Sequence, residues 1–300
     1  MPEPLLRRPD VLVLAGGGTL GEAWMRALLA GAEAEAGGGL DFRACEYFVG
    51  TSAGSIVAAG LAAGRRPEAG GRAEAGYARA IEAAGEVAGR SRPSLAARFG
   101  TVLATPFAPL ALAATAPGGA RLRAAALGRG PVASRRLDDL GRNLDRLGTT
   151  FDGRLRIATV DRLTGRRVVF GAPGAPPASV SEAVLASCAI PWFFAPVRIG
   201  DREYVDGGAW SPTNLDASPA ARGTEVLCLN PTAAAGPLRP FSRASAARET
   251  MVLRARGASV RLVAPDRDVT VAIGPNLMDA GRIDDVLDAG YAQGRRLAAG

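Results

Sequence analysis

Apolar and polar residues follow one another along the chain in a pattern that predicts short buried strands followed by helices. An apolar run at residues 11–15 leads into glycines and then into helical periodicity over residues 22–36. A second apolar run, Tyr47-Phe48-Val49, ends in Gly50-Thr51-Ser52-Ala53-Gly54 and passes into the apolar residues 56–59. We therefore expect two strand-turn-helix units at the start of the chain.

Further elements are predicted downstream. Apolar runs at residues 155–160 and 167–170 flank the turn-like Leu163-Thr164-Gly165 and predict a hairpin or two sheet strands. Residues 181–190 are helical in pattern and stop at Pro191, before an apolar and partly aromatic wall at residues 192–197. The pattern also predicts three more sheet elements and a closing amphipathic helix, at residues 225–229, 259–264 and 269–273 and at residues 284–297.

Residues 64–137 differ from the rest of the chain, because Ala, Arg, Gly and Pro dominate there. We expect helices and loops that cover the sheet. The most apolar stretch, residues 102–116, is too short to span a membrane and is interrupted by Pro106 and Pro109. We expect this stretch to be a buried core segment; an apolar flap over the site, or a patch that touches lipid, is the alternative.

Composition limits the class of protein. A chain of 300 residues that is 48% hydrophobic can bury the core of one large α/β domain or two small ones. Strand pattern begins by Val11, which leaves no room for a secretory signal in the sequence given. Cys45, Cys188 and Cys228 lie in apolar runs, so we expect buried free thiols rather than a disulfide framework or a metal site. These features favour a cytoplasmic protein.

The charge pattern argues against a nucleic-acid partner. The net charge is +7, but every cationic residue is Arg, the Arg-Arg pairs are scattered, and only 5% of residues are aromatic. We therefore expect no nucleic-acid binding. Peripheral contact with anionic membrane surfaces stays open.

The segment Gly50-Thr51-Ser52-Ala53-Gly54 matches the Gly-x-Ser-x-Gly motif of a nucleophile elbow. Gly50 and Gly54 have no Cβ, so the chain can turn tightly around Ser52 and present its hydroxyl at a helix N-terminus. With 39 glycines in the chain the motif alone is weak evidence, and a plain glycine turn is the alternative. The strand before the motif and the helix after it favour a nucleophilic serine.

The chain contains no histidine and no lysine. A Ser-His-Asp triad and a Ser-Lys dyad are therefore excluded, and the general base of a nucleophilic Ser52 must be a carboxylate. Asp206 is the candidate, because it follows a short apolar run and precedes Gly207 and Gly208, where the backbone can approach another segment closely. The same residues could instead form a simple hairpin turn.

A glycine loop, Gly16-Gly17-Gly18-Thr19-Leu20-Gly21, follows the first strand. Gly16, Gly18 and Gly21 satisfy the dinucleotide fingerprint Gly-x-Gly-x-x-Gly, but the next strand ends without the carboxylate that would bind a ribose. A glycine loop at a helix N-terminus can instead direct N–H groups at an anion, such as the oxyanion of acyl transfer. Neighbouring strands that end in this loop and in Ser52 would place donors and nucleophile at one sheet edge.

In this order, the glycine loop, the serine elbow and Asp206-Gly207-Gly208 resemble the patatin-like phospholipase family. Ala186-Ser187-Cys188-Ala189-Ile190-Pro191 and Ser211-Pro212-Thr213-Asn214 also look like family segments, so the resemblance spans residues 10–215. It implies a three-layer α/β/α sandwich with a mostly parallel central sheet. It also implies a single domain over residues 1–300, with residues 64–137 as an insertion.

The resemblance implies a dyad of Ser52 and Asp206 and an oxyanion hole formed by the backbone of Gly16, Gly17 and Gly18. The implied activity is hydrolysis of fatty acyl esters of lipids through an acyl-enzyme, without a metal or an organic cofactor. The family usually has Arg or Lys where this chain has Leu20, which puts in doubt any role for a cation there. A catalytically silent lipid-binding protein, and less so a dinucleotide-binding oxidoreductase, are the alternatives.

Overall fold

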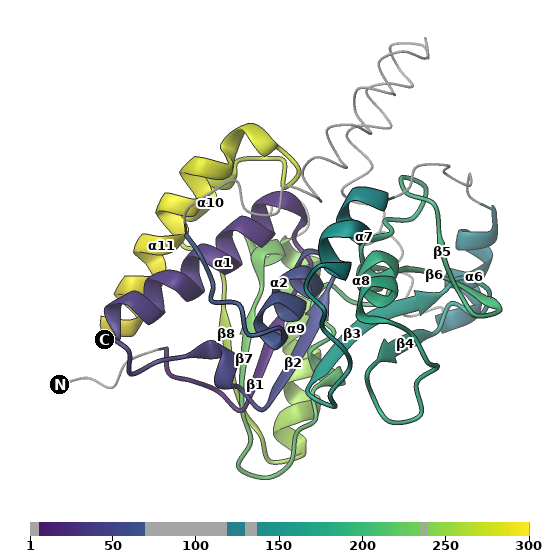
Figure 1. The fold of residues 1–300 in the computed structure, drawn as a ribbon, viewed down its shortest axis with the longest axis horizontal. Helices are drawn as coiled ribbons and strands as arrows, with labels where there is room; N and C mark the ends of the chain where they lie inside the picture. The colour runs from purple at the N-terminus through teal and green to yellow at the C-terminus, as the bar shows by residue number, and fades with distance from the viewer. Residues whose placement is uncertain (1–5, 70–118, 130–136, 235, 237–238, 300) are drawn as a thin grey trace.

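The computed structural model describes residues 6–69, 119–129, 137–234, 236 and 239–299 (Figure 1). The apolar stretch at residues 102–116 lies outside the described residues, as does most of the expected insertion at residues 64–137. The part of that insertion that is described includes helix α6 (Gly119–Arg129).

The described strands form one mixed, mostly parallel sheet of eight strands. Its order is β5-β6-β3-β2-β1-β7-β8, with β4 paired to β3. The pairs β1–β2, β1–β7, β2–β3 and β7–β8 are parallel, and β3–β4, β3–β6 and β5–β6 are antiparallel. In chain order the strands are β1 (Val11–Leu14), β2 (Tyr47–Thr51), β3 (Leu155–Asp161), β4 (Arg167–Phe170), β5 (Val197–Ile199), β6 (Arg202–Asp206), β7 (Glu225–Leu229) and β8 (Ser259–Val263).

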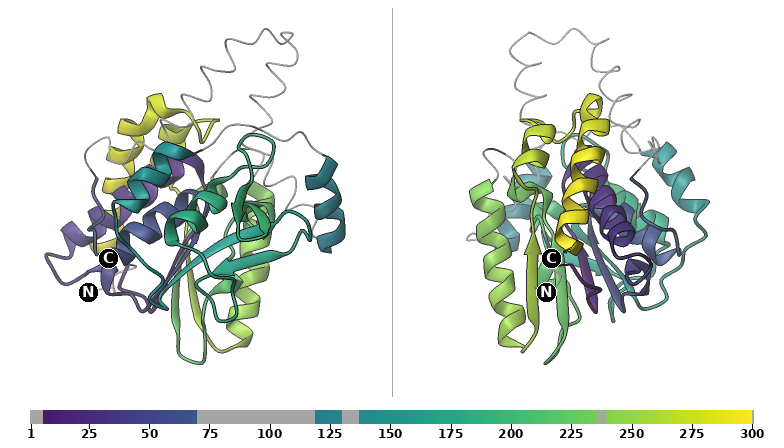
Figure 2. Two further views of the ribbon diagram at one scale, coloured as in Figure 1. Left: turned by 45° about the vertical axis from the view of Figure 1, so that its right-hand side comes forward. Right: turned by 90° about the vertical axis from the view of Figure 1, so that its left-hand side faces the viewer.

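Helices cover both faces of this sheet, so the fold is a three-layer α/β/α sandwich (Figure 2). Helix α9 lies on one face, and α1, α2 and α11 lie on the other. Besides α6, the described α-helices are α1 (Gly18–Glu35), α2 (Ala53–Ala62), α7 (Asp138–Asp145), α8 (Val180–Cys188), α9 (Arg239–Ala255), α10 (Arg267–Ile273) and α11 (Ile283–Ala299).

Two cores explain why β1 is apolar throughout. Leu12 and Leu14 of β1 belong to the core beneath α1, α2 and α11, whereas Val11 and Val13 belong to the core that includes Leu253 of α9. Successive side chains of a strand point to opposite faces, so a strand covered on both sides is apolar at every position. The resulting rigid sheet fixes the positions of the turns that follow its strands.

Helices α1 and α11 pack closely on one face of the sheet. A Cβ on Gly31 would lie 2.2 Å from the Tyr291 carbonyl oxygen, and one on Gly294 would lie 2.0 Å from the Leu28 carbonyl oxygen. Both positions therefore require glycine. This contact supports α1, which begins at the glycine loop.

One predicted element is wrong. Residues 269–273 were expected as a strand but belong to α10. The Asp266 side chain accepts a hydrogen bond from Val269 N–H (3.0 Å) and so starts the helix, and Gly274 (φ +67°) follows its end. The helix cap thus outweighs the strand preference of the β-branched residues in this segment. Helix α9 was not predicted.

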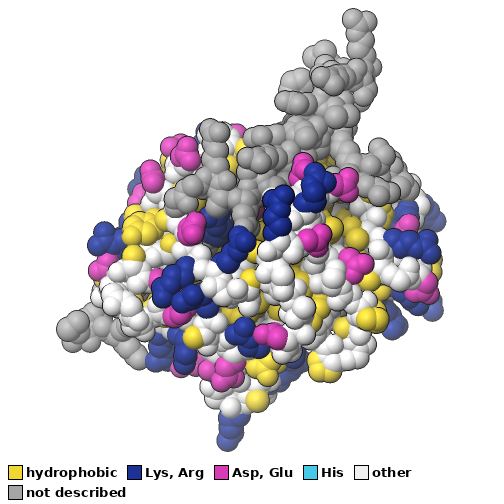
Figure 3. All heavy atoms as spheres, in the orientation of Figure 1, with side chains coloured by type: hydrophobic (Ala, Val, Ile, Leu, Met, Phe, Trp, Pro, Cys, Tyr) yellow, Lys and Arg dark blue, Asp and Glu magenta, His cyan; other side chains and the backbone are white. Residues whose placement is uncertain are grey.

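Other features of the described residues bear on the expectations. The three cysteines are buried and free, as expected, and burial raises the pKa of all three thiols. No described helix is long and apolar enough to cross a membrane. On the face seen in Figure 3, arginine side chains are interspersed with acidic ones rather than gathered in one stripe.

Candidate active site

Strand β3 brings Ser52 and Asp206 together, because two strands share one of its edges. β2 pairs with β3 as far as Thr51, opposite Ala158, and β6 pairs with β3 from Asp206, opposite Thr159. β4 occupies the other edge of β3. β2 and β6 run in opposite directions and so meet end to end, with Ser52 just after one and Asp206 at the end of the other.

Ser52 lies on a strained turn. Its φ of +50° and ψ of −126° place a non-glycine residue in a region that L-residues rarely adopt, and it is the N-cap of α2. A Cβ on Gly54 would lie 2.0 Å from the Leu14 carbonyl oxygen, and one on Gly50 would lie 2.5 Å from Ser55 Cα. Gly50 and Gly54 are therefore required for the tight strand-to-helix turn that presents Ser52.

Hydrogen bonds with two other serines hold this turn. Ser52 N–H donates to Ser187 Oγ (2.8 Å), and Ser187 Oγ donates to the Ala158 carbonyl (2.7 Å). Ser55 Oγ donates to the Ser52 carbonyl (2.6 Å). Ser187 thus connects the elbow to β3. The sequence signalled only that the segment around Ser187 looks like a family segment, not that it supports the elbow.

Ser52 and Asp206 are hydrogen bonded to each other. Ser52 Oγ donates to Asp206 Oδ2 (2.8 Å), and Gly208 N–H donates to Asp206 Oδ1 (2.7 Å). The two side chains are largely shielded from solvent, with Ser52 6% and Asp206 2% exposed. A Cβ on Gly207 would lie 2.3 Å from the Ala158 carbonyl oxygen, so glycine is needed where this turn crosses β3.

Burial raises the pKa of Asp206 to about 7, because an ionised carboxylate loses its hydration inside the protein. The hydrogen bonds from Gly208 N–H and the Ser52 hydroxyl lower this pKa and offset part of the effect of burial. A carboxylate with a pKa near 7 is a much stronger base than an exposed one. It can therefore accept the Ser52 proton at neutral pH.

The glycine loop ends beside this pair, at the N-terminus of α1. Gly16 N–H donates to the Pro212 carbonyl (2.9 Å). Within the described part of the chain, the N–H groups of Gly17 and Gly18 have no protein acceptor. The first turn of α1 contains no acidic residue. Gly17 and Gly18 thus offer two N–H groups at the positive end of a helix dipole, a setting that favours an anion.

Packing holds the glycine loop in place. A Cβ on Gly17 would lie 2.3 Å from Pro231 Cγ, and one on Gly18 (φ +60°) would lie 2.3 Å from Met278 Sδ. Leu20, where the family usually has a cation, is fully buried, and its N–H donates to the Leu277 carbonyl (2.9 Å). The apolar side chain at this position is part of the core.

Converging metal ligands do not occur in the described residues: no group of three or more Cys, Asp or Glu side chains there could hold an ion. The end of β2, where a dinucleotide site would need a carboxylate, is occupied by Thr51 and then Ser52.

The fold places the chain among the three-layer α/β proteins. The patatin-like phospholipase family model matches residues 12–218, and the chain belongs to this family, whose members are typically lipid acyl hydrolases. No curated protein matches the chain. Among solved structures, VipD from Legionella pneumophila is similar, with 16% sequence identity and a TM-score of 0.43 over 97% of this chain and 67% of that chain.

Proposed function

We propose that this chain is a lipid acyl hydrolase that cleaves fatty acyl esters through Ser52 and Asp206. The observation that carries the proposal is the 2.8 Å hydrogen bond between a serine on a strained elbow and a buried carboxylate. The absence of histidine and lysine from the whole sequence supports it, because the base for Ser52 must then be a carboxylate. Membership of the patatin-like phospholipase family supports an ester of a fatty acid as substrate.

The first half of the reaction forms an acyl-enzyme. Ser52 Oγ attacks the ester carbonyl carbon while its proton passes to Asp206 Oδ2, and the carbonyl electron pair moves to the oxygen. Gly17 and Gly18 N–H groups stabilise this oxyanion. When the intermediate collapses, the bond to the leaving alcohol breaks and Asp206 returns the proton to the alcohol oxygen. Gly16 contributes through its bond to Pro212, which holds the loop.

The second half releases the fatty acid. Asp206 takes a proton from a water molecule, whose oxygen attacks the acyl carbon and re-forms the oxyanion at the glycine loop. The bond to Ser52 then breaks, and Ser52 Oγ recovers the proton from Asp206. The enzyme returns to its starting state, and these steps require no metal or organic cofactor.

A cavity that begins one helical turn after the elbow is part of the proposed substrate site. It has a volume of about 450 Å³ and lies between α1 and α2. Ile56, Val57 and Leu61 line its apolar part. The charged residues Glu22, Arg26, Arg65, Arg66 and Glu68 line the rest. We propose that the apolar part of this cavity contacts the acyl chain of the substrate.

Peripheral contact with a lipid surface is part of the proposal. β2 ends at Thr51, opposite Ala158, whereas β3 continues to Asp161. The turn between β3 and β4 therefore projects beyond the carboxyl end of β2, where Ser52 lies. Leu163 in this turn is 82% exposed, and Arg166 beside it is exposed. Leu163→Asp should lower activity on anionic phospholipid vesicles several-fold without changing activity on a soluble ester.

Met251 provides the control for this surface. It is 66% exposed near the C-terminal end of α9. Because α9 leads into the start of β8, Met251 lies near the amino ends of the parallel strands, away from Ser52. Met251→Asp should leave both activities unchanged. Equal loss in the Met251 and Leu163 variants on vesicles would contradict the proposed contact.

The test of the proposed reaction is the Ser52→Ala variant. Its turnover of a short p-nitrophenyl ester should fall to background while its thermal melting stays close to that of the wild type. A fluorophosphonate probe should label the wild type covalently at Ser52 and fail to label the variant. Retained turnover in a well-folded variant would refute the proposed nucleophile.

A further inference from the structure

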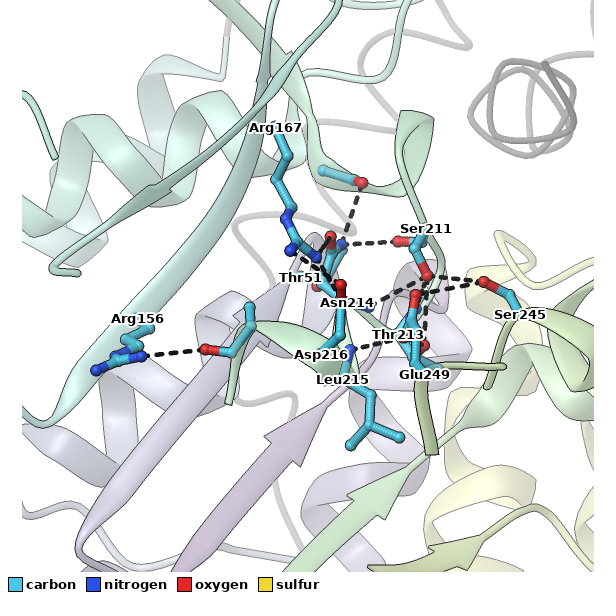
Figure 4. Close-up of polar contacts among 12 residues, drawn as sticks. Thr51, Arg156, Arg167, Ser211, Thr213, Asn214, Leu215, Asp216, Ser245 and Glu249 are labelled. Carbon is cyan, nitrogen blue, oxygen red and sulfur yellow. Dashed lines mark hydrogen bonds and ion pairs between the residues drawn. The ribbon is translucent and has the colours of Figure 1, made fainter. Parts of the chain in front are cut away.

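Glu249 of α9 is a buried carboxylate that the proposed reaction does not use. It is 3% exposed, and burial raises its pKa. Its Oε2 accepts hydrogen bonds from the Thr213 hydroxyl and from Leu215 N–H (2.8 Å), as Figure 4 shows. Ser245 Oγ lies 3.4 Å from its other oxygen, Oε1. The two donors to Oε2 thus belong to one short segment, residues 211–215.

The same segment contacts all three parts of the candidate site. The Pro212 carbonyl accepts the N–H of Gly16 in the glycine loop (2.9 Å). Asn214 Nδ2 donates to Thr51 Oγ1 (3.2 Å), next to Ser52, and to the Gly207 carbonyl (3.2 Å), next to Asp206. A displacement of residues 211–215 would therefore change how the glycine loop, the elbow and the base lie relative to one another.

Asn214 needs support to keep this position. Its φ of +46° is left-handed, and its amide also donates to the Ser211 carbonyl (2.7 Å). Arg167 donates to Asn214 Oδ1 (3.3 Å) and pairs with Asp216 through both terminal nitrogens. A residue in a strained conformation persists only where its surroundings fix it. Thr213 and Leu215, which flank Asn214, are the two residues that donate to Glu249 Oε2.

We propose that Glu249 is a positioning residue for the hydrolysis. Through Thr213 and Leu215 it fixes Asn214 and Pro212, and through these it aligns the glycine-loop donors with Ser52 and Asp206. The inference rests on the proposed function. Glu249 bonds to neither Ser52 nor Asp206; it supplies an oxygen acceptor at a fixed place. This matters because small displacements of reacting groups lower rates strongly.

The experiment compares kcat and KM on a short p-nitrophenyl ester, well below the melting temperature of each variant and with active sites counted by fluorophosphonate titration. Glu249→Ala should lower kcat by about 10- to 100-fold with KM within about twofold. Glu249→Gln keeps an oxygen that can accept both hydrogen bonds, so it should restore kcat to within about threefold. Thr213→Val, which removes only one donor, should lower kcat by about 3- to 10-fold.

Thr250 is the matched control, because it is the next residue on α9. Among the described residues its buried hydroxyl has no hydrogen-bond partner, so it makes no hydrogen bond to residues 211–215. Thr250→Val should leave kcat unchanged. A fall in kcat as large as that in Thr213→Val would overturn the inference, because disturbance of α9 alone would then explain both.

A merely structural Glu249 would lower the melting temperature of Glu249→Ala and leave kcat per active site unchanged, which would also overturn the inference. If Glu249→Ala does not fold, the Thr213→Val variant provides the test. An unchanged kcat in that variant would then overturn the inference. Wild-type turnover that disappears in Ser52→Ala but persists in full in the Glu249 and Thr213 variants refutes this inference alone. A wild type without Ser52-dependent turnover refutes the proposed function and this inference together.

Discussion

The surroundings of Asp206 and Glu249 are alike in chemistry and differ in backbone. Each carboxylate accepts a backbone N–H and a hydroxyl, Glu249 having a second, longer hydroxyl bond from Ser245 (3.4 Å), and burial raises the pKa of each. The hydroxyl that faces Asp206 belongs to Ser52, at φ +50° on an elbow before α2, whereas the hydroxyl that faces Glu249 belongs to Thr213, which has no positive φ. The two carboxylates are therefore distinguished less by their own surroundings than by the backbone that carries the hydroxyl: a strained elbow faces the proposed base Asp206, and an unstrained residue faces the proposed positioning residue Glu249.

Isosteric amides should separate the two carboxylates most sharply. Asp206→Asn keeps the shape but cannot take the Ser52 proton, so kcat/KM on a p-nitrophenyl ester and the rate of fluorophosphonate labelling should both fall by at least ~10³. Glu249→Gln keeps an acceptor and should stay within about threefold of the wild type. A folded Asp206→Asn protein that labels at the wild-type rate would remove Asp206 from the mechanism.

Two neighbouring acids serve as controls for Asp206. Asp201 is exposed, and Glu203 forms a surface ion pair with Arg162 (2.6 Å). Asp201→Asn and Glu203→Gln should therefore stay within a few fold of the wild type in the same assay. Loss of activity in Glu203→Gln with full activity in Asp206→Asn would place the base on Glu203 instead.

The glycine loop should show the next largest effect. A Cβ at Gly17 or Gly18 would lie 2.3 Å from Pro231 Cγ or Met278 Sδ, so Gly17→Ala and Gly18→Ala must displace the loop and its donors. We expect each to lower kcat by about 10², the usual cost of losing an oxyanion donor. A Cβ at Gly16 would meet nothing closer than Ser52 Cβ at 3.5 Å, so Gly16→Ala should cost less than about tenfold. Equal losses at all three positions would contradict the separate roles assigned to them.

The pH dependence of kcat/KM should report the environment of Asp206. A base must be ionised, so activity should rise with pH and level off above the pKa of Asp206, about 7 in the folded protein. The measurement is a profile of kcat/KM for a neutral ester from about pH 4 to 9. A midpoint near the ordinary aspartate value of 3.8 would show that burial does not control the base.

Much of the parallel sheet is predictable from local sequence. The apolar runs at residues 11–15, 225–229 and 259–264 correspond to β1, β7 and β8 within one residue at each end. β1 and most of β7 are buried, so their apolar runs are continuous, whereas β8 at the end of the sheet includes the exposed Ser259 and the partly buried Arg261. The strand expected at residues 269–273 failed because the cap at Asp266 lies outside the apolar run that suggested it.

The candidate site is only partly local. Gly-x-Ser-x-Gly and Asp-Gly-Gly identify Ser52 and Asp206 as candidates, but the two are 154 positions apart, and their contact depends on β2 and β6 sharing an edge of β3. Their catalytic roles stay predictions. Glu249 has no local signal, because Arg248 and Thr250 beside it read as an ordinary polar helix face and its partner Thr213 is 36 positions away.

The smallest expected effect is on stability, and it has the opposite sign to the effect on activity. The pKa of Asp206 is about 7 in the folded protein against the ordinary 3.8. Because the folded-state pKa is raised, the contribution of this group to stability is complete below about pH 4 and is lost as the pH rises through about 7.

Above that pH the fold contains a buried charge that the Asp206→Asn variant lacks. The amide oxygen of the variant can still accept Gly208 N–H, and its NH₂ group can donate to Ser52 Oγ. At pH 8 the inactive variant should therefore be about 1–3 kcal/mol more stable than the wild type, a rise of several degrees in Tm. At pH 4 the two proteins should have the same Tm. Glu203→Gln, at an exposed position of the same strand, should show no such pH-dependent gain. Calorimetric melting at the two pH values measures this difference, and a gain of equal size at both would show that the carboxylate is not penalised by burial.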